Sequence, residues 1–245
     1  MQNYKLTLAF DGSAFHGWQR QENALGIQQV VEQCLSTLCR HTVAVTGCSR
    51  TDAGVHARHF VCNFYANTNI PPEKIPFAMN TLLPRQIRVY DCTPAGDTFN
   101  ARFDAKSKEY VYQVLNAKHN DPFHANYAWH FPGKLDIHLM EKACTLLTGK
   151  HDFSAFMASG GQQKQMKKDM QSITLTRDGN LISLTYHADS YLYNMVRILT
   201  GTIVYVGCGK IDCNDLPGIV QSKDRTLAGM TAPPQGLFLH KAHYK

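Results

Sequence analysis

The stretch Tyr4-Lys5-Leu6-Thr7-Leu8-Ala9-Phe10 opens the chain with apolar side chains at every second position. Alternation with a period of two is typical of a strand that buries one face. Downstream, Ile27, Val31 and Leu35 recur at helical spacing, which predicts an amphipathic helix. The chain therefore begins with a strand, a polar loop and a helix, as an α+β fold does.

The rest of the first half continues this pattern. Strands are predicted at 42–48 and 59–66, and a polar loop from Ser49 to Arg58 joins them. A weak helix from Pro71 to about Leu83 and a strand containing Ile87 and Val89 follow. The predicted order is β-α-β-β-α-β, which is the order of a ferredoxin-like unit.

The second half repeats the plan. It offers a strand from Lys108 to Leu115, a long loop, a helix at 136–147, a hairpin of strands at 170–177 and 181–187 turning at Asp178-Gly179-Asn180, a helix at 190–206, a short helix after Asn214 and a last strand around 237–239. We expect two ferredoxin-like halves, 1–104 and 105–245. Their sheets are expected to form one continuous, mostly antiparallel sheet with a cleft where the halves meet.

Composition narrows the class of protein. Hydrophobic residues make up 44% and charged residues 18% of 245 residues, which excludes global disorder. The sequence contains no apolar run long enough for a membrane span and no signal-peptide pattern at its start, so we expect a cytoplasmic protein. The net charge of +6 is compatible with a phosphate-rich partner but does not establish one.

The cysteines and histidines carry no metal pattern. Eight cysteines occur without a C-x-x-C pair, and twelve histidines occur without an H-E-x-x-H motif. Buried thiols in a reducing compartment explain the cysteines better than disulfides or zinc. We therefore expect neither a metal nor a cofactor.

The densest polar stretch of the first half runs from Gly47 to Arg58 and contains Asp52 between two arginines. From the residues alone, a turn in which Asp52 caps backbone N–H groups is favoured over a catalytic role. A carboxylate beside arginines is nevertheless held ionised, as a nucleophile or a proton acceptor requires.

Several segments together are far more specific than this one loop. The stretch RTDAGVH at 50–56 resembles the signature of the TruA-type tRNA pseudouridine synthases. Similar segments follow in the family's order over nearly the whole chain: FDGS with FHGWQRQ at 10–21, ARF at 101–103, KEYVY at 108–112, DFSAF at 152–156, MVR at 195–197 and TAPPQGL at 231–237. Three residues depart from the family pattern, namely Cys48-Ser49 in place of small residues such as Ala-Gly and Asn100 in place of a histidine.

The resemblance implies roles for four residues and a pseudouridine synthase fold. It makes Asp52 the catalytic aspartate, Tyr110 the aromatic side chain that stacks on the target uracil, and Arg197 the partner of the aspartate. It also implies that Arg50 helps to open the RNA around the flipped base. Taken alone, a Tyr in an alternating run such as Tyr110 is more commonly an ordinary strand aromatic. Arg197 in an apolar helix needs a partner, for which Asp52 is our nominee.

The resemblance further implies the substrate and the assembly. The family modifies uridines of the anticodon stem-loop of tRNA, at positions 38, 39 and 40, and works as a homodimer without a cofactor. The reaction breaks the C1′–N1 bond, turns the uracil and forms a C1′–C5 bond. Asp52 either adds to C1′ or removes a proton from C2′, and the sequence leaves both paths open. The flipped uridine loses its stacking, which an aromatic platform such as Tyr110 compensates.

Scattered cations are candidates for RNA phosphate contacts. They would act this way if they surround the cleft, although for each one alone a solvated surface charge is the favoured interpretation. These candidates are Arg20, Arg58, Lys106, Lys108 and the loop lysines Lys164, Lys167 and Lys168.

Two other functions fit parts of the sequence. A metal-dependent nuclease would bind magnesium with Asp11 and Asp52, and its activity would disappear in excess chelator. A catalytically silent RNA-binding protein built on two ferredoxin-like modules would show exposed sheet aromatics in an RNP1-like pattern, which we do not find. It would release no tritium from tRNA labelled at uracil C5.

Overall fold

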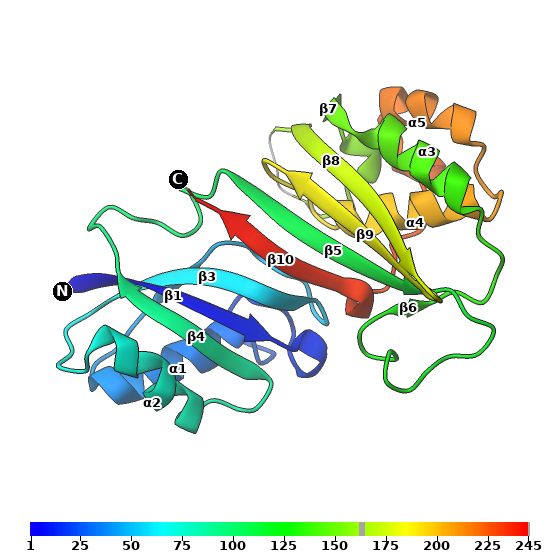
Figure 1. Ribbon diagram of the computed structural model, residues 1–245. Coiled ribbons are helices and arrows are strands. Elements are labelled where there is room, and N and C mark those ends of the chain that lie inside the picture. The colour runs from blue at the N-terminus through cyan, green and yellow to red at the C-terminus, as the bar shows by residue number, and fades with distance from the viewer. Residues whose placement is uncertain (162–164, 245) are drawn as a thin grey trace. The chain divides into compact units, whose positions relative to one another are not determined.

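The computed structural model describes residues 1–161 and 165–244 (Figure 1). By contacts the chain forms two units, Met1–Lys106 with Phe238–Lys245, and Ser107–Leu237. The sequence-based division assigns all of 105–245 to the second half, whereas the contacts place the last strand with the first unit. The reason is a parallel pairing, in which Phe238 and Leu239 lie opposite His56 and Ala57.

The first unit is a mostly antiparallel sheet with helices on one face, visible at the blue and cyan end of Figure 1. The predicted element order is confirmed: β1 (Gln2–Phe10), α1 (Ile27–Cys39), β2 (Val45–Gly47), β3 (His56–Ala66), α2 (Ile75–Leu82) and β4 (Ile87–Pro94). Strand β1 pairs antiparallel with both β3 and β4, β2 pairs antiparallel with β3, and β10 (Leu237–His243) pairs parallel with β3.

The core of this unit follows the alternation in the sequence. The apolar side chains of β1 that repeat at every second position, Leu6 and Leu8 among them, are buried. On α1 the buried side chains include Ile27, Val31 and Leu35, the stripe predicted from helical spacing. Burying each such side chain contributes roughly 1.5 to 3 kcal/mol, so the two patterns stabilise the same core.

The strands of the second unit also pair mostly antiparallel. Its strands lie in the order β5 (Ser107–Leu115), β9 (Leu181–Ala188), β8 (Lys167–Asp178) and β7 (Gly149–Asp152), and β6 (Trp129–His130) pairs parallel with β5. Its helices are α3 (Ile137–Leu147), α4 (Met195–Gly207) and α5 (Leu216–Ser222). Gly179 has φ +57° in the β8–β9 turn, as the Asp178-Gly179-Asn180 turn predicted. The protein is thus of the α+β class.

Short 3₁₀ segments complete the described residues: Gly12–Ala14, Pro72–Lys74, Ser154–Phe156, Cys213–Asp215, Arg225–Leu227 and Pro234–Gly236.

Three local expectations are corrected. The helix predicted at 190–206 begins only at Met195, because Asn194 has a left-handed backbone with φ +57° and cannot continue a right-handed helix backwards. The expected lysine loop ends earlier than predicted, since Lys167 and Lys168 already belong to β8. The short strands β6 and β7 were not predicted, because two to four residues carry too little periodicity.

Six of the eight cysteines are buried, and Cys39 and Cys208 are partly buried. All eight lie within the described residues and none of them forms a disulfide. Burial raises the pKa of Cys34 to about 11 and the pKa values of Cys92 and Cys144 to about 12. Among the described residues no helix is long and apolar enough to cross a membrane.

Candidate active site residues on the two units

Asp52 lies in the loop between β2 and β3 of the first unit. The loop leaves β2 with Cys48, whose N–H donates to Val61 O at 2.9 Å, and it ends where β3 begins at His56. Within it, Val55 N donates to Asp52 O at 3.2 Å, and Gly54 has φ +77°. The carboxylate therefore sits in a tight turn, as expected for this stretch, and its side chain is half-buried.

A second segment, residues 11–18, contacts this loop through backbone atoms. Trp18 N donates to Thr51 O at 3.1 Å, and Gly54 N donates to Phe15 O at 3.4 Å. Gly17 has φ +82°, and a Cβ there would lie 2.5 Å from Thr51 O. This approach requires glycine, and it holds the backbone on both sides of Asp52.

Gly12 makes the same kind of approach on the other side of the turn. A Cβ on Gly12 would lie 2.1 Å from Val55 O, and Gly12 N donates to His56 Nδ1 at 3.0 Å. Asp11 Oδ1 lies 3.2 Å from the same nitrogen, but Nδ1 cannot both accept from Gly12 and donate to Asp11. We favour the bond from Gly12, because a backbone amide always carries its proton and this one is buried.

Asp11 is the N-cap of a short 3₁₀ helix. Its Oδ1 accepts from Ser13 N at 2.9 Å and from the Ser13 hydroxyl, which caps the short helix at 12–14. This engagement explains Asp11 without a metal ion, so the structure adds no support to a nuclease that binds magnesium with Asp11 and Asp52.

Thr51 differs from other buried polar residues. It is 7% exposed, and its Oγ1 is the one buried side-chain polar atom without a hydrogen-bond partner in the part of the chain that the structure describes. An orphan hydroxyl costs free energy unless a ligand or water satisfies it. Its position next to Asp52 makes it a candidate for a contact with the substrate, and no sequence pattern distinguished it from an ordinary turn threonine.

Tyr110 lies on β5 of the second unit, and its side chain is buried, as is that of Tyr112 on the same face of the strand. Its ring meets the ring of Tyr191 edge-on, with centroids 5.0 Å apart and an interplanar angle of 81°. The Tyr191 hydroxyl is 2.9 Å from Lys108 O and 3.0 Å from Tyr186 O. These contacts fix the orientation of the Tyr110 ring, which a stacking platform needs.

Arg197 lies in the first turn of α4 and its guanidinium is anchored twice. Nε donates to Ala232 O and Nη1 donates to Asn194 Oδ1, both at 2.7 Å. The side chain is half-buried, so the expectation that an arginine in an apolar helix has partners is confirmed. Its pairing with Asp52, which belongs to the other unit, stays a prediction.

The cations on the first unit differ in how they are held. Arg20 Nη1 lies 3.4 Å from Glu32 Oε2, with the arginine side chain 61% exposed. The guanidinium of Arg58 lies over the ring of Phe238 at 5.1 Å from its centroid, and Lys106 is exposed. Arg50, in the Asp52 loop, is exposed as well.

The candidate lysines on the second unit differ in how far they are exposed to solvent. Lys167 is exposed at the start of β8, and Lys108 is half-buried on β5. Lys168 is buried, with 9% exposure, and this disfavours a direct contact between its side chain and an RNA phosphate. Lys164 lies outside the described residues.

Phe103 is a candidate RNA contact that sequence reasoning did not single out. It is 76% exposed on a turn in which Asn100 Oδ1 accepts from Arg102 N at 3.0 Å and from Phe103 N at 3.2 Å. The Arg102 guanidinium lies 5.5 Å from the Phe103 ring centroid. Asn100 thus has a structural reason to replace the family's histidine, and the signal for Phe103 was an aromatic beside an arginine in a turn.

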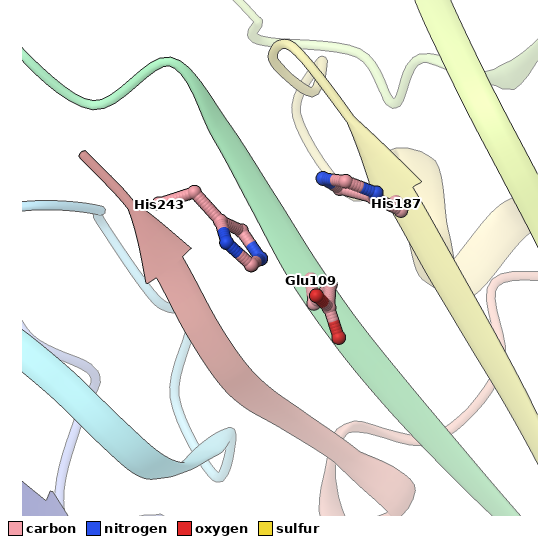
Figure 2. A group of neighbouring side chains, drawn as sticks. All are labelled: Glu109, His187 and His243. Carbon is pink, nitrogen blue, oxygen red and sulfur yellow. The ribbon is translucent and has the colours of Figure 1, made fainter. Parts of the chain in front are cut away.

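Glu109 and His187 are a pair of titratable residues on neighbouring strands of the second unit. They are cross-strand partners on β5 and β9, and His187 Nε2 lies 2.7 Å from Ser107 Oγ. Figure 2 shows both residues, together with His243 of β10, which belongs to the first unit.

Comparison with known proteins gives a consistent result. A family model described as tRNA pseudouridine synthase matches residues 7–104 and 143–245. A tRNA pseudouridine synthase A from Thermoanaerobacter sp. (strain X514) is 44% identical over 244 residues, and one from Ruminiclostridium cellulolyticum is 41% identical over 245 residues. A relative from Clostridium perfringens, named tRNA pseudouridine synthase A 2, is 38% identical over 244 residues. In each case the alignment covers 100% of both chains.

Proposed function

The chain belongs to the tRNA pseudouridine synthase family, and from that premise we propose that Asp52 is its catalytic carboxylate. The protein is an isomerase that converts uridine in tRNA into pseudouridine. The observation that carries the assignment of Asp52 is the turn at 50–56. The stretch that resembles the family signature lies there. The backbone of Asp52 is held in place because Gly17 and Gly12 pack closely against the backbone on either side of it.

The chemistry asks for one carboxylate and a base-sized pocket. The C1′–N1 bond of the target uridine breaks, the uracil turns, and C5 bonds to C1′. The proton leaves C5 and another is taken up at N1, so that the product is an isomer of the substrate. Asp52 serves either by adding to C1′ or by removing a proton from C2′. Both paths require an ionised carboxylate, which is the ordinary state of an aspartate at neutral pH.

Three further residues complete the proposed site. Tyr110, with its ring held edge-on by Tyr191, stacks on the flipped uracil. Arg197, with its guanidinium anchored at Nε and Nη1, pairs with Asp52. Arg50, exposed beside Asp52, helps to hold the RNA open.

The finer features of the substrate and the assembly follow from the family resemblance. The target is the anticodon stem-loop, at the uridines named above, and the active form is a homodimer in the cytoplasm. The reaction needs no metal ion, so activity persists in excess chelator. Sedimentation tests the dimer, and sequencing of pseudouridine sites in tRNA treated with the enzyme tests the target positions.

Exposed cations supply the phosphate contacts in this proposal. Arg58, Lys106 and Lys167 are exposed, and Arg102 with Phe103 offers a cation beside an aromatic ring. Phosphate contacts make tRNA affinity fall steeply with salt concentration, whereas stacking contacts do not.

Tritium release from tRNA labelled at uracil C5 tests the central claim. Asp52→Ala and Asp52→Asn are expected to lower the rate by about 10³-fold or more while tRNA binding persists. Asp97→Asn, at an exposed carboxylate of the same unit, is the matched control and should release tritium at the natural rate. Normal turnover by Asp52→Asn would remove Asp52 from the mechanism, and no release by the natural protein would favour a silent RNA-binding protein.

A further inference from the structure

We propose that Asn194 is a positioning residue, which holds the guanidinium of Arg197 in the orientation that the reaction needs. The proposal rests on the role of Arg197 given above. Asn194 itself touches neither substrate nor reacting atoms in this account. It acts through the hydrogen bond between its Oδ1 and Arg197 Nη1 at 2.7 Å.

The side chain of Asn194 is not used in the way its position predicts. Asn194 is the N-cap of α4, and its backbone carbonyl accepts from Ile198 N at 3.0 Å. An asparagine at an N-cap ordinarily accepts a hydrogen bond from a backbone N–H of the first turn. In the described residues of this turn the Asn194 side chain makes no such bond and instead accepts from the guanidinium.

The backbone of Asn194 explains how its side chain reaches Arg197. With φ +57° and ψ +11°, the residue is left-handed, whereas an N-cap is ordinarily extended. Asparagine tolerates this conformation better than other side chains except glycine. The turn before α4 therefore directs Oδ1 toward the guanidinium rather than toward the helix amides.

The second anchor of the guanidinium is rigid. Arg197 Nε donates to Ala232 O at 2.7 Å, and Ala232 N donates back to Arg197 O at 3.1 Å. The segment before Ala232 packs tightly on α4, since a Cβ on Gly201 would lie 1.9 Å from Met230 O. The bonds at Nε and Nη1 hold the guanidinium at two different nitrogens, so the loss of the bond to Asn194 loosens the plane of the group.

The same turn also supports Tyr110. Tyr191, three residues before Asn194, provides the edge contact to the Tyr110 ring at 5.0 Å. Residues 191–194 thus position two of the proposed substrate-binding side chains from one short connection. A displacement of about 1 Å in a catalytic constellation can lower a rate by roughly a hundredfold, so such supports have large effects without touching substrate.

Asn194→Gly removes the side-chain acceptor and keeps the backbone, because glycine adopts positive φ readily. The expected result is a decrease of about tenfold or more in the single-turnover rate of tritium release, as for the loss of a hydrogen bond to a charged group. The tRNA dissociation constant should change less than about threefold, and the melting temperature should stay within a few degrees. Asn180→Gly, in the exposed β8–β9 turn, is the matched control and should leave the rate unchanged.

A double-mutant cycle with Arg197→Lys separates a positioning role from a merely structural one. Lysine keeps the charge but lacks the planar guanidinium, so Asn194→Gly should cause little further loss in that background. The inference is overturned if Asn194→Gly releases tritium as fast as the natural protein. It is also overturned if the rate losses caused by Asn194→Gly and Arg197→Lys add in full in the double variant. If Arg197→Lys and Arg197→Ala themselves turn over normally, the proposed role of Arg197 fails instead, and the two failures are distinguishable.

Discussion

Gly17→Ala should loosen the Asp52 loop through its backbone, with the Asp52 side chain left unchanged. Gly17 has φ +82°, and forcing a residue with a Cβ into that region costs about 1 to 2 kcal/mol. The added Cβ would also meet Thr51 O at 2.5 Å, an atom that cannot rotate away because it is backbone. Overpacking of this kind costs about 1 to 3 kcal/mol, so the total is about 2 to 5 kcal/mol.

Relief of the clash requires the loop and the 11–18 segment to separate. The bond from Trp18 N to Thr51 O at 3.1 Å is then lost, and Asp52 moves with its neighbour. We expect the melting temperature to fall by roughly 5 to 15 °C. The kcat for tritium release should fall by more than the fraction of unfolded protein explains.

Gly96→Ala is the matched control for this substitution. Gly96 lies in the same unit, and a Cβ there would have no heavy atom within 4 Å. Thermal unfolding followed by circular dichroism and tritium release at a temperature where both variants are folded give the two readouts. If Gly17→Ala matched Gly96→Ala in stability and in kcat, the 11–18 segment would not be what holds the Asp52 loop.

Three further outcomes are expected. Tyr110→Ala should lower kcat/KM for tRNA by roughly 10- to 100-fold, because stacking contributes about 1 to 3 kcal/mol per base. Tyr110→Phe keeps the ring and should retain most of the activity. Equal losses of kcat/KM for the two variants would contradict the stacking role. Thr51→Val should raise the free energy of unfolding by about 1 kcal/mol in urea titrations, since it removes an orphan buried hydroxyl. If Thr51→Val nevertheless lowers tritium release, the hydroxyl contacts substrate, and if it destabilises the protein, the hydroxyl has a partner. Stability should also fall as the pH rises above about 9, because the pKa values of Cys34, Cys92 and Cys144 are raised by burial to about 11, 12 and 12. Their thiols stay protonated in the folded state while the unfolded chain ionises, so this contribution is fully present below pH 9 and is lost toward pH 11 to 12; a flat unfolding free energy between pH 9 and 11 would show that the thiols are accessible.

Local sequence patterns were sufficient to predict a helix or strand where that element buries one of its faces. The alternation from Tyr4 to Phe10, the α1 stripe and the Asp178-Gly179-Asn180 turn each predicted the observed element, because periodicity and turn geometry act between near neighbours. The Asp52 loop was placed between two strands for the same reason, although β3 begins at His56, inside the stretch from Ser49 to Arg58 that was predicted as loop. From physical chemistry alone, however, its aspartate was an ordinary turn residue, and only the resemblance along the whole chain pointed to catalysis.

The tertiary structure decided what depends on contacts between distant parts of the chain. The apolar run around Ile198 predicted a helix from 190, but the Asn194 side chain bonds the Arg197 guanidinium and the helix begins after it. The last strand joined the first unit through pairing with β3, which no pattern within 237–243 encodes. Likewise, Gly17 reads as a loop glycine until Thr51 O is found where its Cβ would be. Sequence by itself therefore determined the elements and the family, whereas the supports of Asp52 and Arg197 arise from packing between segments that no local period connects.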